Sequence, residues 1–145
     1  NLLIAFLTFL SILIVSVYYQ SNYLTVGLYA SLAFFISLIR EIVKDMEDVK
    51  GDASFGSKTL PIIYGQRGAK RFVYVIAIIF LAVLLLFETY IDLWSLKIIG
   101  IIVALEVIVL VYLVYWADTK DKIHFCSNFC KAILLTGVVS MIWVN

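Results

Sequence analysis

Residues 40–52 read Arg-Glu-Ile-Val-Lys-Asp-Met-Glu-Asp-Val-Lys-Gly-Asp and hold five of the chain's ten carboxylates. The rest of the chain is strongly apolar, since 64% of its 145 residues are hydrophobic and only 14% are charged. A soluble domain of this size needs far more polar surface, so lipid is the expected solvent. Two apolar runs precede the polar stretch and three follow it, and the chain is organised around it.

The apolar runs have the length of membrane spans, because about 20 residues cross the hydrocarbon core of a bilayer. They cover residues 2–19, 24–39, 72–87, 96–115 and 125–144. Gln20-Ser21-Asn22 is expected to form a polar turn, and residues 53–71 a long loop with the chain's single proline. We predict an all-α fold: a multi-span bundle of five transmembrane helices, with residues 1–145 forming one domain in the lipid bilayer.

The basic residues predict how the bundle is oriented. If the spans alternate in direction, ten of the eleven lysines and arginines fall on one side of the membrane, and only Lys97 falls on the other. Loops rich in lysine and arginine stay in the cytoplasm. The acidic stretch is therefore expected to be cytoplasmic.

The carboxylates of the stretch line up if the second helix continues through it. Asp45, Asp48 and Asp52 then fall within a sector of about 60°, and Glu41 joins the same stripe. Aligned carboxylates repel one another, and a divalent cation removes that penalty. Magnesium typically takes one or two carboxylates together with substrate phosphates. With Arg40 and Lys44 alongside, the pattern suits a metal-bridged diphosphate; the alternative is a solvated segment whose acids pair with its own bases.

Together with Lys58-Thr59-Leu60-Pro61, the stretch resembles the second Asp-rich motif of the UbiA superfamily of intramembrane prenyltransferases. Asp45, Asp48 and Asp52 match its D-x-x-D-x-x-x-D form. The resemblance implies that these three residues are catalytic and bind Mg2+, and that Arg40, Lys44 and Lys58 bind the diphosphate. It also implies that the five spans are the C-terminal part of a nine-helix bundle.

The resemblance further implies an enzyme that moves a prenyl group from an allylic prenyl diphosphate to a lipophilic acceptor. The pattern R-E-x-x-K-D-x-E-D-x-x-G-D is most similar to the branch that makes digeranylgeranylglyceryl phosphate. That branch implies geranylgeranylglyceryl phosphate as acceptor, ether-lipid synthesis and the cell membrane of a prokaryote. An aromatic acceptor, as in quinone, haem or chlorophyll-type prenylation, is the alternative. No nucleic-acid partner is expected.

One departure from the family pattern matters for activity. The first Asp-rich motif of the family, N-x-x-x-D or N-D-x-x-D, does not occur in this sequence. We expect the chain to be a fragment that lacks the N-terminal helices and half of the metal site, and to be inactive by itself.

Two other classes of membrane protein fit the sequence less well. CDP-alcohol phosphotransferases carry a D-G-x-x-A-R core, which is absent here. A transporter or a structural subunit predicts charges spread along the spans, and only Glu106 fits that pattern. An acid at that depth is either functional or hydrogen-bonded between helices. His124, Cys126 and Cys130 form a weak metal-like cluster, and we interpret the two cysteines as small apolar residues of a membrane helix.

Overall fold

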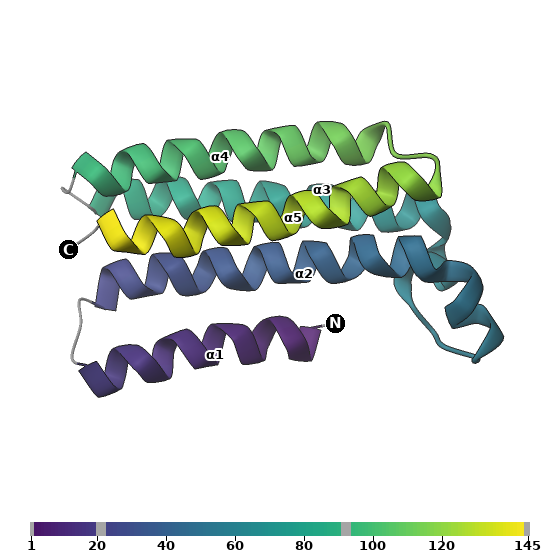
Figure 1. Cartoon of the computed structure of the whole chain (residues 1–145), viewed down its shortest axis with the longest axis horizontal. Coiled ribbons are helices and arrows are strands. Elements are labelled where there is room, and N and C mark those ends of the chain that lie inside the picture. The colour runs from purple at the N-terminus through teal and green to yellow at the C-terminus, as the bar shows by residue number, and fades with distance from the viewer. Residues whose placement is uncertain (1, 20–22, 91–93, 144–145) are drawn as a thin grey trace.

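Every regular element of the structure is helical within the residues that it describes. This computed structural model describes residues 2–19, 23–90 and 94–143. The helices are α1 (Leu2–Tyr19), α2 (Tyr23–Ser54), α3 (Leu60–Tyr90), α4 (Trp94–Tyr115), α5 (Lys120–Ser140) and the short 3-10 helix η1 (Met141–Trp143) (Figure 1). The all-α prediction is confirmed. The expected turn at Gln20-Ser21-Asn22 and the expected end of the last span at Val144 lie outside the described residues.

The helices have the dimensions of membrane spans. By length and composition, the four helices α2 to α5 can each cross a membrane. The remaining helix, α1, is apolar and 18 residues long. A bundle with this many apolar helices is an integral membrane protein, as the composition predicts.

The connection between α2 and α3 differs from the predicted loop. Residues 53–71 were expected to lack regular structure, but α3 already begins at Leu60 and only residues 55–59 lie between the two helices. Pro61 stands in the first turn of α3, where its missing N–H leaves no helical hydrogen bond unmade. Gly65 interrupts the helix with φ 72°, a left-handed conformation that suits glycine. Gly65 therefore bends a helix and does not belong to a long loop.

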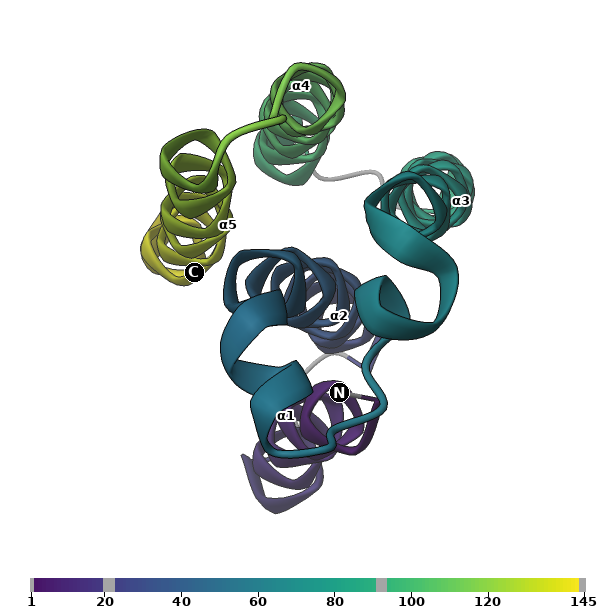
Figure 2. The ribbon, with the colours of Figure 1, turned by 90° about the vertical axis from the view of Figure 1, so that its right-hand side faces the viewer.

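The central element of the bundle is α2. It packs against α1, α3 and α5, whereas α4 packs against α3 and α5. Figure 2 shows the consequence end-on: α1 lies on one side of α2, and α3, α4 and α5 form an arc on the other side. The helix that carries the acidic stretch is thus the one that the rest of the chain surrounds.

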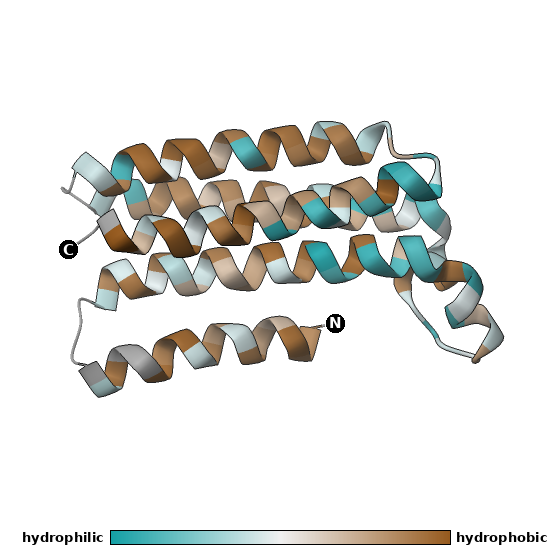
Figure 3. Cartoon of the chain, viewed as in Figure 1, coloured by the Kyte–Doolittle hydropathy of each residue, from teal (hydrophilic) through white to brown (hydrophobic). Residues whose placement is uncertain are grey.

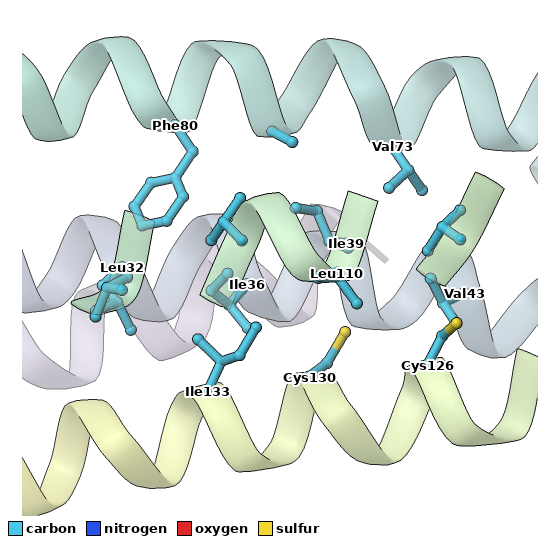
Figure 4. Close-up of a cluster of buried hydrophobic side chains, with 14 of the residues drawn as sticks. Leu32, Ile36, Ile39, Val43, Val73, Phe80, Leu110, Cys126, Cys130 and Ile133 are labelled. Atoms are coloured by element: carbon cyan, nitrogen blue, oxygen red, sulfur yellow. The ribbon is translucent and has the colours of Figure 1, made fainter. Parts of the chain in front are cut away.

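The core lies between α2 and the arc of three helices. Figure 4 shows side chains from four helices in one buried cluster, which includes Ile36 and Val43 of α2, Phe80 of α3, Leu110 of α4 and Ile133 of α5. Lipid tails are as apolar as these side chains, so close packing holds such helices together more than the hydrophobic effect does.

Glycine lets two of these helices approach closely. A Cβ atom added at Gly137 of α5 would lie 3.1 Å from Cδ2 of Leu32 in α2. Such a contact between a small residue and a large one is typical of helices packed within a membrane.

Hydrophilic residues gather at one end of the bundle. Figure 3 shows them where α2 ends and α5 begins, while the middle of the bundle is mostly hydrophobic. The acidic stretch lies at this end of the bundle, which we call the charged end.

Candidate functional site

The acidic stretch is helical throughout, because α2 continues past its apolar run to Ser54. At about 100° per residue, Asp45, Asp48 and Asp52 fall within about 60° of one another, and Glu41 joins them. We call the side of α2 that carries these four residues the acidic face. The structure confirms the helical spacing on which the predicted acidic face depends.

The acidic face points toward the side of the bundle where α1 lies. Phe34 of α2 contacts Phe9 of α1 edge to face, with ring centroids 6.2 Å apart. Asp45 and Asp48 follow Phe34 by close to three and four helical turns, so they continue the same side of α2. Met46, by contrast, is buried in the core on the other side. The acidic face is therefore turned away from the arc of α3, α4 and α5.

The predicted site residues differ in exposure and in their partners. Asp48 is exposed, whereas Asp45 and Asp52 are half-buried. Arg40 donates a hydrogen bond of 2.9 Å to Glu41, and the two form an ion pair at the start of the stretch.

The two predicted lysines, Lys44 and Lys58, are exposed. Within the described ranges, no ion pair joins either lysine to the three aspartates. The loop that carries Lys58 is tied to the end of α2, because the Ser57 N–H donates to the Asp52 carbonyl at 3.0 Å.

The donor set of the acidic face fits a shared magnesium ion and not a complete metal cage. In the part of the chain that the structure describes, no three His, Cys, Asp or Glu side chains group closely enough to hold one metal. Neighbouring residues of the face are one turn apart, or about 5–6 Å between Cβ atoms. Magnesium commonly takes only one or two carboxylates and fills its other positions with phosphate oxygens and water. Asp45 and Asp48 are suited to supply that small share.

His124 binds the acidic stretch from α5, which the sequence did not predict. Its Nδ1 lies 2.8 Å from Glu47 Oε1, and its Nε2 lies 3.0 Å from Asn128 Nδ2. Asn128 Oδ1 in turn accepts a hydrogen bond of 2.9 Å from Lys131. Since the Asn128 amide donates to Nε2, the imidazole N–H lies on Nδ1 and donates to Glu47. The chain of hydrogen bonds ties the charged half of α2 to α5.

The two cysteines take no part in this network. Cys126 and Cys130 are free thiols buried in the core, and Figure 4 shows them pointing from α5 into the same cluster as Val43. The interpretation of Cys126 and Cys130 as small apolar residues agrees with this placement. The histidine of the suspected metal cluster is instead a partner of Glu47.

A pocket of about 580 Å³ opens at the charged end between α2, α3 and the connection from α4 to α5. We call it the basic pocket. Its lining residues are Met46, Glu47, Asp48, Val49, Lys50, Gly51, Gln66, Arg67, Lys70, Ala117, Asp118, Lys120 and Ile123. Of the six predicted site residues, only Asp48 is among them. From the sequence, Lys50, Arg67, Lys70 and Lys120 contribute only to the predicted orientation of the chain, because nothing in a single sequence shows that they surround one pocket.

Hydrogen bonds fix two walls of the basic pocket. Gln66 donates to the Met46 carbonyl at 2.9 Å and joins α3 to α2. Lys70 donates to the Tyr115 carbonyl at 3.1 Å and to Asp118 at 2.9 Å. The hydrogen bond and charge of Lys70, with smaller contributions from Lys122 and Arg67, hold the pKa of Asp118 below its usual range. Asp118 is therefore an anion held among cations.

Glu106 is hydrogen-bonded between two helices. Its Oε1 accepts a hydrogen bond of 3.0 Å from Thr136 of α5, while its buried Oε2 has no partner in the described residues. Of the two roles left open for an acid at this depth, the structure shows the interhelical hydrogen bond.

Comparison with known proteins connects this geometry to a family. The profile described as the UbiA prenyltransferase family matches residues 1–133. A digeranylgeranylglyceryl phosphate synthase of Methanosphaera stadtmanae is 35% identical over 111 residues, which are 74% of this chain and 40% of that protein. No solved structure matches significantly.

Shorter matches are closer in sequence. A digeranylgeranylglyceryl phosphate synthase of Methanopyrus kandleri is 60% identical over 47 residues, 32% of this chain and 17% of that protein. One of Thermococcus gammatolerans is 58% identical over 43 residues, 30% of this chain and 16% of that protein. The chain thus spans less than half the length of these curated relatives.

Proposed function

Because this chain belongs to the UbiA prenyltransferase family, we propose that residues 1–145 form one transmembrane domain, the C-terminal part of a nine-helix enzyme that transfers a prenyl group. The donor is an allylic prenyl diphosphate, and the acceptor is a lipophilic molecule in the bilayer. The observation that carries the proposal is the acidic face, which ends a central membrane helix at the charged end of the bundle.

Asp45, Asp48 and Asp52 would hold magnesium together with the diphosphate. When bound, magnesium neutralises the charge that builds on the leaving oxygens as the allylic C–O bond breaks. The helix contributes preorganisation, since the buried side of α2 keeps the carboxylates in place before substrate arrives. Because the acidic face points toward the α1 side, we propose that the remaining ligands approach the metal from that side.

The basic residues near the acidic face would hold the diphosphate itself. Arg40 already lies against Glu41, so its guanidinium is oriented along the face. Lys44 and Lys58 are exposed and long, which suits them to reach phosphate oxygens as point charges. Their positive charge favours departure of the diphosphate, because it offsets the negative charge left behind.

The chemistry is proposed to take place at the cytoplasmic surface of a prokaryotic cell membrane. Ten of the eleven lysines and arginines lie on the side of the acidic stretch, in keeping with the excess of basic residues in cytoplasmic loops. A prenyl diphosphate has a charged head and an apolar tail, so it fits a site at the end of a bundle whose middle is apolar.

The proposed acceptor is geranylgeranylglyceryl phosphate, as the names of the relatives suggest. The test uses the full-length protein in lipid nanodiscs, radiolabelled geranylgeranyl diphosphate, and either this glycerophosphate lipid or an aromatic acid as acceptor. We expect magnesium-dependent labelling of the glycerophosphate lipid, which excess EDTA stops. Labelling of the aromatic acid alone would contradict the proposed acceptor, and no labelling of either would contradict the proposed activity.

A further inference from the structure

The basic pocket lies on a different side of α2 from the acidic face. Met46 and Lys50, one turn apart, both line it, and Met46 is buried toward the arc of α3, α4 and α5. Asp48 is the single residue that belongs to both the acidic face and the lining of the basic pocket. A ligand of the pocket would therefore be separate from a diphosphate on the acidic face.

The lining of the pocket holds four cations (Lys50, Arg67, Lys70 and Lys120) and three carboxylates (Glu47, Asp48 and Asp118), so its net charge is positive. Lys70 is paired with Asp118, and Glu47 is bound by His124. Lys50, Arg67 and Lys120, however, make no side-chain hydrogen bond or ion pair with any residue in the described ranges. They come from three elements, α2, α3 and the first residue of α5. Cations gathered around one hollow repel each other, and an anion in the hollow removes that repulsion.

We propose that the basic pocket binds a phosphate monoester group. Arg67 presents a planar fork that matches phosphate oxygens, and Lys50 and Lys120 add mobile charges. The doubly charged phosphate suits three cations better than a carboxylate does. The volume of about 580 Å³ exceeds that of a phosphate alone, and Met46, Ala117 and Ile123 give it an apolar part. The proposed acceptor carries the same group, but binding in the pocket is proposed and measured independently of prenyl transfer.

A doubly charged terminal phosphate is present in the headgroup of phosphatidic acid and in inorganic phosphate, so the test has two arms. In the first, the full-length protein in phosphatidylcholine nanodiscs is titrated with inorganic phosphate in a calorimeter. In the second, native mass spectrometry measures retention of phosphatidic acid by the protein from nanodiscs that contain 10% of it, about one lipid in ten. Both arms compare the wild type with Arg67→Gln/Lys120→Gln.

The matched control is Arg71→Gln/Lys122→Gln. It removes the same residue types from the same two helices, and neither residue lines the pocket. Circular dichroism of each variant checks that the helices remain. An Asp45→Asn variant checks that binding does not take place on the acidic face.

We expect Arg67→Gln/Lys120→Gln to weaken binding about tenfold or more, and the control by less than about twofold. Loss confined to the second arm identifies a lipid headgroup, and loss in the first arm identifies soluble phosphate; either result supports the pocket. Equal binding by wild type and Arg67→Gln/Lys120→Gln in both arms would overturn the proposal, as would equal losses in the two double variants.

Discussion

Replacing Asp48 by Asn in the full-length protein is expected to lower magnesium-dependent prenyl transfer about a thousandfold. The amide keeps the size of the side chain but removes the charge that a metal ligand needs. Asp48 is exposed on the acidic face, so the substitution leaves the packing of the helices unchanged. The measurement is the single-turnover rate with labelled prenyl diphosphate at saturating acceptor.

The control for Asp48→Asn is Glu47→Gln, which removes one negative charge from the next residue of the same helix. Glu47 points to His124 of α5 and not along the acidic face. We expect its rate to fall less than about tenfold. Comparable losses in the two variants would mean that net charge matters and the direction of the acidic face does not.

The largest effect on stability is expected from Phe80→Ala. Phe80 is fully buried in α3 and packs against Phe35 of α2, with ring centroids 5.3 Å apart. The side chains of an unfolded membrane protein are still surrounded by lipid or detergent. The loss in free energy of unfolding therefore comes mainly from the cavity that the substitution leaves. About 100 Å³ of removed volume at about 24 cal/mol per Å³ corresponds to about 2 kcal/mol. The measurement is unfolding by SDS in mixed micelles, followed by circular dichroism.

Phe125→Ala is the control for this substitution. Phe125 is 57% exposed on α5, so its truncation leaves no enclosed cavity. The free energy of unfolding of the Phe125→Ala variant should differ from that of the wild type by less than about 0.5 kcal/mol. Equal losses of stability in the two phenylalanine variants would contradict the placement of Phe80 in a core between α2 and the arc of α3, α4 and α5.

The sequence predicted the helices because lipid demands long apolar runs, and these are visible without any tertiary information. It also predicted the acidic face, since helical spacing needs only the local periodicity of Asp45, Asp48 and Asp52. It did not predict the start of α3 at Leu60. The glycines at positions 65 and 68 suggest a loop, whereas the helix is interrupted only at Gly65 and continues into the membrane.

Contacts between residues far apart in the chain could not be predicted from the sequence. His124 and Glu47 are 77 residues apart, and only the packing of α5 on α2 brings them within 2.8 Å. The same holds for Arg67 and Lys120, which look like ordinary cations of a membrane surface until the fold places them around one pocket. The direction of the acidic face likewise depends on which side of α2 contacts α1.

The most direct test of the acidic face as a metal–diphosphate site replaces magnesium with Mn2+ in the full-length protein and adds an unreactive prenyl thiodiphosphate. Electron–nuclear double resonance then reports whether phosphorus lies next to the bound Mn2+. We predict phosphorus couplings in the wild type and their loss, together with the bound Mn2+ signal, in Asp45→Asn/Asp48→Asn. Unchanged couplings in that double variant would contradict the assignment of the acidic face as the metal–diphosphate site.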